Sequence, residues 1–397
     1  MKPFDLNLRH LRAIRHIVAE RSLNRAADAA GLSQPALTQG LGKVERQLGV
    51  QLFDRNPDGM APTAAGLALA DRIDRAFAQL ATIRRTSKRG FARPEALMTA
   101  TQAEAFLHFA DAGSFAGAAG TSGLSQPAIH RAVRELEQIW ATPLAERRGR
   151  GMMLTPAGRA LARGVRLAAR EIAAGIAEAR GDAKGGGRIA VGAMPLSRAR
   201  LLPHALARFL AEAPGTVLDV VEGSWRELVD PLLDGVIDLM IGALRPDPPA
   251  GLDQAPLFTD RLAIFGRAGH PLAGRDVDLD QLATQSWVVG PTGTPLRTHW
   301  ETLFTGRALP AVPIECGSVM VIRGLLTESD LLTLLSPDQV ALEVDAGLLV
   351  RIGPELIDTV RTIGISTRAG WRPTTAQARL VALLKQAAVD TRLQENR

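Results

Sequence analysis

The chain has 397 residues, more than one ordinary hydrophobic core requires, so its length predicts two to four domains. Hydrophobic residues make up 46% of the chain and charged residues 22%, which is typical of a folded protein and excludes a disordered one. No apolar run approaches the roughly 20 residues of a membrane span, and the N-terminus lacks the apolar core of a secretion signal. The single cysteine, Cys316, excludes an internal disulfide, and we expect a cytoplasmic protein without a membrane partner.

Positive charge is concentrated in the first part of the chain. Residues 1–180 hold 26 Lys and Arg against 16 Asp and Glu, a balance of +10, whereas residues 181–397 hold 21 against 25, a balance of −4. A polyanion would therefore bind the first part, although a charged helix face is more often merely solvated.

Three short helices are predicted near the N-terminus. Apolar residues recur at the helical period around Ile14, and Ser22 is placed to cap a second helix of small residues. Gly31 supplies a turn. Ser33 is then placed to cap a third helix, in which Pro35 occupies the first turn, where a missing N–H is harmless.

A hairpin and a longer helix follow. The turn-forming residues 56–59 predict the loop of a β-hairpin, or wing, and Thr63 is placed to cap a longer helix with an apolar stripe. The whole pattern recurs without a gap 92 residues later, so that Ser33-Gln34-Pro35-Ala36 superposes on Ser125-Gln126-Pro127-Ala128 and Thr63 on Thr155. Two copies are too few for a solenoid, and the repeat therefore indicates a duplicated domain.

The repeat and the linkers set the expected domain boundaries. The residues after Lys184 include three glycines, 185–187, which predict a hinge rather than a phosphate loop because no Gly-Lys-Ser/Thr motif follows. We expect a first three-helix unit with its wing over 1–62, a longer helix over 63–96, a second such unit over 97–154, a second longer helix with the hinge over 155–187, and a further domain over 188–390.

Helix, tight turn, helix and wing is a geometry that places one helix end in the major groove of DNA. Amides in the first turns of the third helix can bridge the edge of adenine, Arg can bridge that of guanine, and wing arginines can hold phosphates. A small bundle used for protein contact fits the bare pattern equally well. The expected DNA-binding residues are Ser33, Gln34, Pro35, Thr38, Gln39 and Arg55 in the first copy, and Ser125, Gln126, Pro127, His130, Arg131, Arg147, Arg148 and Arg150 in the second.

A shared motif is formed by residues 8–11, 26–27, 31–37, 48–55 and 63–66 in the first copy, and by 113–115, 124–129, 136–137 and 154–158 in the second. On these residues both copies resemble the LysR-type transcriptional regulators. The resemblance implies a winged helix-turn-helix, a linker helix that dimerises and an effector domain similar to periplasmic binding proteins. The expected fold is therefore multidomain, with two tandem all-α winged helix-turn-helix units followed by a two-lobed α/β effector domain.

The chain also departs from the family pattern. The family usually has one DNA-binding unit where this chain has two. Gly40 and Gly42 weaken the first recognition helix, and Gln39 stands where the family often has Arg. The second copy keeps Arg131 and a basic wing, so we expect it to be the stronger DNA reader.

The last part of the chain predicts the effector domain. Two sets of alternating strands and helices are typical of parallel α/β lobes, which bind ligands at the carboxyl ends of their strands. Cys316 lies in an apolar run, and we expect it to be buried. The first set has strands over 189–192, 217–221 and 236–241 and helices over 201–210 and 225–233, and the second has strands over 262–265, 287–289 and 312–314.

The expected effector contacts follow strands in both lobes. Thr294 is placed to cap a helix with Arg297 in its first turn, and free N–H groups, the positive helix end and a guanidinium suit an anion. Each cap residue could instead only terminate its helix, which is the simpler interpretation of Ser224 and Ser318 taken singly. We expect a carboxylate or sugar acid, bound by Met194, Pro195, Leu196, Ser197, Ser224, Gly293, Thr294, Arg297 and Ser318.

The sequence argues against an enzyme. The seven His residues show no metal-ligand spacing, and no Gly-x-Ser-x-Gly elbow or Cys-His pair occurs, so we expect no catalytic residue, cofactor or metal. The expected function is a sequence-specific transcriptional regulator that binds double-stranded DNA and an effector, with RNA polymerase as a candidate partner. One copy could instead serve only for protein contact or pseudo-dimerisation. The linker helices would pair within one chain, or ordinary dimers would carry four units.

Overall fold

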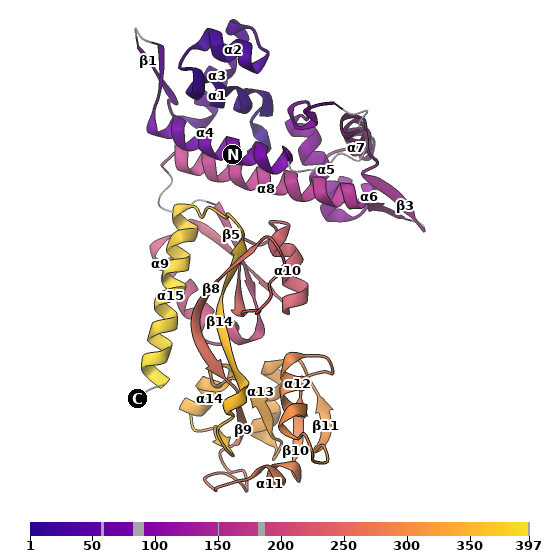
Figure 1. The fold of residues 1–397 in the computed structure, drawn as a ribbon, viewed down its shortest axis with the longest axis vertical. Coiled ribbons are helices and arrows are strands. Elements are labelled where there is room, and N and C mark those ends of the chain that lie inside the picture. The colour runs from indigo at the N-terminus through magenta and orange to yellow at the C-terminus, as the bar shows by residue number, and fades with distance from the viewer. Residues whose placement is uncertain (57–58, 82–90, 150, 182–186, 396–397) are drawn as a thin grey trace.

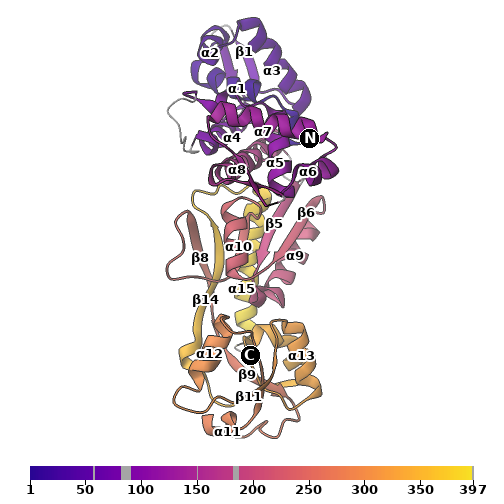
Figure 2. The same cartoon turned by 90° about the vertical axis from the view of Figure 1, so that its right-hand side faces the viewer.

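The computed structural model describes residues 1–56, 59–81, 91–149, 151–181 and 187–395. Two helical units at one end are followed by two α/β lobes along the length of the molecule (Figures 1 and 2). None of the helices within those ranges combines the length and the apolar character that a membrane span requires.

The predicted order of elements is confirmed in both helical units. A 3-10 turn, η1 (Pro3–Asp5), precedes the first unit and η2 (Pro94–Ala96) precedes the second. The first unit contains α1 (Leu8–Glu20), α2 (Leu23–Ala30), α3 (Gln34–Leu48), β1 (Phe53–Asn56), β2 (Gly59–Pro62) and the linker helix α4 (Ala64–Ala81). The second contains α5 (Ala100–Ala112), α6 (Phe115–Ser122), α7 (Gln126–Trp140), β3 (Ala145–Arg148), β4 (Gly151–Leu154) and the linker helix α8 (Pro156–Ala179).

Most of the predicted helix caps form. The side chains of Ser33, Ser125, Thr63 and Thr155 each accept a hydrogen bond from the backbone N–H three residues further on, at 3.0–3.4 Å. Ser22 occupies the N-cap position of α2 but makes no capping hydrogen bond with its side chain, so that detail of the prediction is wrong. The other serine and threonine signals set where these helices begin.

Each wing is tied to its recognition helix by one glutamate. The carboxylate of Glu45 in α3 accepts a hydrogen bond from the backbone N–H of Leu52 at 2.8 Å, and Glu137 in α7 accepts one from Leu144 at 2.9 Å. These four residues superpose pairwise in the 92-residue repeat. The two units therefore share not only their element order but also the side-chain contacts that fix the start of the wing.

The linker helices α4 and α8 pack antiparallel against each other, and Figure 1 shows them side by side across the base of both units. The start of α4 meets the end of α8, because a Cβ atom on Gly175 would lie 3.0 Å from Leu69 and 2.9 Å from Arg72. At the centre, Ala76 and Ala168 line the same small space between the helices. These two alanines are equivalent in the repeat, as residues on a local two-fold axis would be.

Lobe I contains one five-stranded sheet in the order β6-β5-β7-β14-β8. Strand β5 is parallel to β6 and β7, as predicted, but β14 is antiparallel to β7 and β8, so the expectation of a fully parallel sheet is wrong. The reason is that β14 returns from lobe II and enters the sheet from the opposite end (Figure 1). The strands are β5 (Gly187–Ala193), β6 (Thr216–Glu222), β7 (Leu239–Ala243), β8 (Leu252–Arg261) and β14 (Val360–Arg368), and the helices are η3 (Pro195–Arg198), α9 (Leu201–Glu212), α10 (Trp225–Leu233) and α15 (Thr375–Glu395).

Lobe II contains the antiparallel sheet β12-β9-β13 and the parallel pair β10-β11, which a bridge between Trp287 and Leu332 joins. Its core includes the aromatic rings of Trp287, Trp300 and Phe304, which pack edge to face with ring centroids 5.5–6.0 Å apart. The strands are β9 (Ala263–Arg267), β10 (Ser286–Val289), β11 (Ala311–Glu315), β12 (Thr333–Leu335) and β13 (Leu349–Ile352), and the helices are α11 (Leu279–Ala283), α12 (Pro295–Leu303), α13 (Val319–Glu328), η4 (Pro337–Val340), α14 (Ala341–Asp345) and η5 (Ile357–Thr359).

Cys316 follows β11 directly and is half-buried, so the expectation of full burial is wrong. Its thiol contacts the backbone oxygen of Ser318 at 3.6 Å. The apolar run that suggested burial forms β11. This strand pairs only with β10, and alternate side chains of β11 face solvent.

Candidate DNA interface and effector site

The recognition helices α3 and α7 present their first turns to solvent. Their apolar residues, such as Leu37 in α3 and Ile129 in α7, are buried against the rest of each unit. Thr38 is half-buried, and its hydroxyl donates to the backbone oxygen of Gln34 at 3.0 Å. The other predicted DNA-binding residues of the two helices are all exposed: Ser33, Gln34, Pro35 and Gln39 at α3, and Ser125, Gln126, Pro127, His130 and Arg131 at α7.

The wings carry exposed arginines. Arg55 lies on β1, and Arg147 and Arg148 lie on β3. Among the described residues, no carboxylate lies within ion-pair distance of these three guanidinium groups, which leaves them available for phosphates. The predicted contact Arg150 lies outside the described residues, as do Pro57 and Asp58 of the first wing turn and most of the hinge at 185–187.

A packing reason explains one of the two glycines in the first recognition helix. A Cβ atom on Gly40 would lie 2.8 Å from the His10 ring of α1, so α1 and α3 approach closely only without it. Burial, together with Lys43 and Arg9, lowers the pKa of His10, which favours the neutral ring at this contact. Gly42 has only the Arg46 guanidinium nearby, at 3.4 Å, and packing does not require it.

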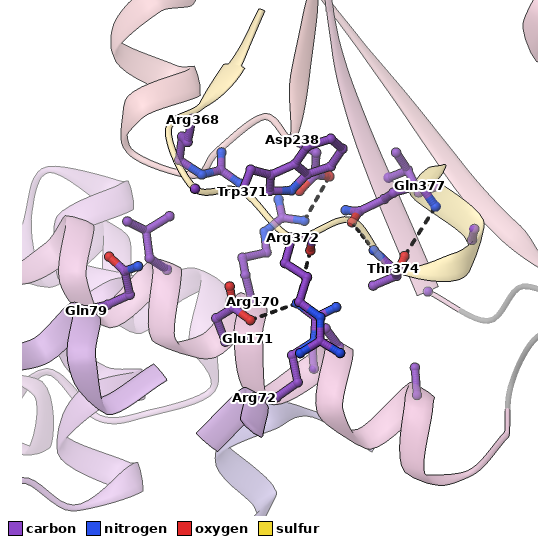
Figure 3. Close-up of a pocket in the computed structure, with 18 of the residues that line it drawn as sticks. Arg72, Gln79, Arg170, Glu171, Asp238, Arg368, Trp371, Arg372, Thr374 and Gln377 are labelled. Atoms are coloured by element: carbon purple, nitrogen blue, oxygen red, sulfur yellow. Dashed lines mark hydrogen bonds and ion pairs between the residues drawn. The ribbon is translucent and has the colours of Figure 1, made fainter. Parts of the chain in front are cut away.

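Arg72 sits at the crossing of α4 and α8. Its side chain is 1% exposed, and its guanidinium hydrogen-bonds to Glu178 at 2.5 Å and to Glu171 at 2.8 Å (Figure 3). Burial by itself would lower the pKa of Arg72, but the hydrogen bonds to Glu178 and Glu171 outweigh it and raise the pKa above its ordinary value. The same guanidinium donates to the backbone oxygen of Arg372 at 3.0 Å, so it also contacts lobe I.

Further arginines attach lobe I to the linker helices, an arrangement that the sequence analysis missed. Arg163 of α8 pairs with Asp234 at 2.5 Å, and Arg170 pairs with Asp238 at 3.2 Å. A cavity of about 480 Å³ lies in this junction, with Trp371 in its wall (Figure 3). The spacing of Arg163, Arg166 and Arg170 along one helix face was the available signal.

The predicted effector residues of lobe I lie together after β5 and β6. Ser224 is exposed at the N-cap of α10, and Met194 and Pro195 begin η3. Leu196 and Ser197 are instead buried, and the Ser197 hydroxyl donates to the backbone oxygen of Met194 at 2.9 Å. These two side chains therefore point into lobe I, where they do not form an open ligand surface.

The predicted residues of lobe II also lie at one edge. Thr294 caps α12, and Ser318 caps α13 at the ends of the neighbouring strands β10 and β11; Gly293 is exposed beside Thr294. Arg297, however, is engaged by two carboxylates, and hydrogen bonds chiefly to Glu301, and also to Glu315, raise its pKa. Both distances are 2.7 Å, and the guanidinium lies 5.0 Å from the Trp300 ring centroid. An incoming anion would compete with these partners.

The two predicted edges face each other across the junction of the lobes. Strand β5 runs towards lobe II, and α12 and α13 lie on the side of lobe II nearest lobe I (Figure 1). The turns η3 and η4 are in contact there. Arg245, which follows β7 at this edge, was missed; its guanidinium lies 5.4 Å from the Trp225 ring centroid, and no carboxylate of the described residues pairs with it. Its position just after a strand was the available signal.

Family models match both parts of the chain. The model of the LysR substrate binding domain matches residues 183–389. The model described as "Bacterial regulatory helix-turn-helix protein, lysR family" matches twice, over residues 8–67 and 100–159. These ranges contain both recognition helices and both lobes.

Curated relatives are regulators of the same type. The HTH-type transcriptional regulator GalR of Pseudomonas putida is 31% identical over 390 residues, 97% of this chain and 98% of its own length, so the match includes both helical units. PcaQ of Agrobacterium fabrum is 29% identical over 72% of this chain and 93% of its own length, and is therefore shorter than this chain.

Solved structures show the same fold. ArgP of Mycobacterium tuberculosis superposes with a TM-score of 0.59 at 18% identity, covering 72% of this chain and 96% of its own. A full-length OxyR variant of Pseudomonas aeruginosa superposes with a TM-score of 0.56 at 23% identity, covering 72% and 93%. The chain belongs to the LysR family and is a DNA-binding transcriptional regulator with an effector-binding domain, not an enzyme.

Proposed function

We propose that a single chain occupies an operator with both helix-turn-helix units, as an intrachain counterpart of a dimer. The antiparallel packing of α4 and α8 carries this proposal. The helices meet around the equivalent residues Ala76 and Ala168, as expected for two units related by a local two-fold axis. Proteins with that symmetry bind two half-sites in inverted orientation.

The surface chemistry supports DNA binding by both units. Each recognition helix exposes a first-turn glutamine, Gln34 or Gln126, and each wing exposes an arginine at the same position of the repeat, Arg55 or Arg147. The net charge of +10 over residues 1–180 favours binding to a polyanion. A unit that served only as a pairing module would not need these exposed groups.

The second part of the proposal is an anionic effector bound between the lobes, in a protein that acts in the cytoplasm. Arg245 and the N-termini of α12 and α13 supply positive potential at the facing edges. Closure of the lobes on a carboxylate or sugar acid would move lobe I, which Arg163 and Arg170 attach to α8. The effector would thereby alter how the helical units engage DNA.

The number of chains on one operator tests the first part. The operator is identified by footprinting DNA upstream of the chain's own coding region, and the mass of the complex is measured by native mass spectrometry. One chain per duplex is expected. The variants Gln34→Ala/Gln39→Ala and Gln126→Ala/Arg131→Ala should each lower affinity at least about tenfold, whereas Arg275→Ala, an exposed arginine of lobe II, should not.

Two outcomes would overturn this part. A complex with two or more chains on the minimal duplex excludes intrachain pairing of half-sites. Full affinity and selectivity in either double variant, with an unchanged circular dichroism spectrum, shows that the altered unit does not read DNA.

Titration calorimetry with a panel of carboxylates, sugar acids and neutral sugars tests the second part. Carboxylates or sugar acids should bind, and Arg245→Met should weaken that binding at least about tenfold while Arg275→Met leaves it unchanged. Binding of neutral sugars alone, or an unaltered affinity in Arg245→Met, contradicts an anionic effector at this edge.

A further inference from the structure

We infer that the operator is not a palindrome: the two units read different half-sites, and this difference fixes the direction in which the chain lies on DNA. The inference rests on the proposed binding of one chain through both units. It follows from a comparison of what the 92-residue repeat keeps and what it changes.

The repeat keeps the groups that build each unit. Glu45 of α3 and Glu137 of α7 make the same hydrogen bond to the start of their wings. Their carboxylates accept from the backbone N–H of Leu52 at 2.8 Å and of Leu144 at 2.9 Å. The caps Ser33 and Ser125 accept hydrogen bonds of 3.4 and 3.3 Å. The two recognition helices thus begin at equivalent residues and are held by equivalent contacts, so equivalent side chains should reach equivalent base pairs.

The repeat changes exposed side chains one turn further along the recognition helix. Gln34 and Gln126 are identical, but Gln39 of the first unit corresponds to Arg131 of the second. Both of these residues are exposed. Thr38, half-buried and hydrogen-bonded to its own helix, corresponds to the exposed His130. The conserved scaffold therefore carries two different reading surfaces.

The chemistry of position 39 and its counterpart predicts different bases. A glutamine amide pairs with the N6 and N7 edge of adenine, and a guanidinium pairs with the O6 and N7 edge of guanine. His130 stands beside Phe115, with ring centroids 5.1 Å apart, whereas Thr38 at the equivalent position is bonded to its own helix. The second half-site should therefore contain guanine where the first contains adenine, with a preference of about tenfold or more for each.

The rest of the molecule is also unequal about the local axis. Lobe I attaches to α8 through Arg163 and Arg166, whereas the equivalent residues of α4 are Asp71 and Asp74. Asp71 pairs with Arg372 of lobe I, and Asp74 pairs with Arg15 of α1. The effector domain is therefore fixed to one orientation relative to the two reading surfaces, and an asymmetric operator orients it along the promoter.

Selection from randomised duplexes tests the inference with the full-length chain. The wild type should enrich an inverted pair of half-sites that differ at the position read by residues 39 and 131. The variant Thr38→His/Gln39→Arg makes the two reading surfaces alike and should enrich a palindrome of the second half-site. The reciprocal variant His130→Thr/Arg131→Gln should enrich a palindrome of the first.

Competition binding against the asymmetric duplex and the two palindromes gives the magnitude. We expect the wild type to prefer the asymmetric duplex by about tenfold or more, and each variant to prefer its own palindrome. An added arginine could also raise affinity through its charge alone; that effect would appear equally on all three duplexes and would steepen the salt dependence.

A wild-type consensus that is palindromic overturns the inference, as does a Thr38→His/Gln39→Arg variant whose consensus is unchanged. The mass of the complex is measured on the same duplexes. One chain on a palindromic consensus refutes the asymmetry but leaves the proposed single-chain binding intact. Two chains on the duplex refute the proposed binding itself.

Discussion

Replacement of Arg72 by methionine should destabilise the helical part of the chain by about 3 kcal/mol. Methionine keeps much of the volume but leaves Glu171 and Glu178, whose side chains are 14% and 19% exposed, without their main partner. Removal of one member of a buried ion pair costs about 3–5 kcal/mol. The lower figure applies because Arg75 and Arg372 lie 3.6 and 3.8 Å from these carboxylates and can compensate in part.

Urea denaturation followed by circular dichroism at 222 nm, with a separate record of tryptophan fluorescence, measures this loss. Arg15→Met is the matched control: its partner Asp74 lies at 3.2 Å but is 59% exposed, so the control should cost less than about 1 kcal/mol. The double variant Arg72→Met/Glu178→Gln should recover part of the stability. An Arg72→Met chain within about 1 kcal/mol of the wild type, which is roughly the error of such measurements, would refute the reasoning.

Three other substitutions follow from the structure. Gly158→Ala places a Cβ against the backbone oxygen at the start of the second wing, so it should cost about 1–3 kcal/mol and lower DNA affinity, and a wild-type melting curve would contradict this. Burial lowers the pKa of His270 from 6.5, so the unfolded chain binds the proton more readily and the stability of the fold should decrease as the pH drops below 6.5. In His270→Gln, urea midpoints measured between about pH 7 and 5 should depend less on pH. An unchanged dependence would exclude the imidazole as its source. Arg297→Met should weaken effector binding much less than Arg245→Met, because Arg297 is already paired with carboxylates, and calorimetry that ranks them the other way would restore Arg297 as the anion ligand.

Local signals predicted the helical units well. The caps Ser33, Thr63, Ser125 and Thr155 depend on contacts within four residues, and the repeat supplied each pattern twice. The predicted helix at 225–233 has the observed bounds for a similar reason, since a serine cap precedes a regular apolar period.

Long-range contacts account for what the sequence did not reveal. The direction of β14 depends on how the chain returns from lobe II, and no residue within the strand encodes it. Ser197 and Arg297 have side chains suited to a ligand, but packing turns the first inward and carboxylates from α12 and β11 engage the second. The role proposed for Arg245 depends on the fold, which places its guanidinium over the Trp225 ring at the edge between the lobes.

The contact between α4 and α8 affects how promoter occupancy depends on protein concentration. Both helices belong to one polypeptide, so they meet at an effective concentration on the order of millimolar however few molecules a cell holds. Separate subunits fall apart on dilution, and their occupancy of a promoter then drops with the square of their abundance. On the proposed single-chain binding, occupancy falls only in direct proportion to abundance.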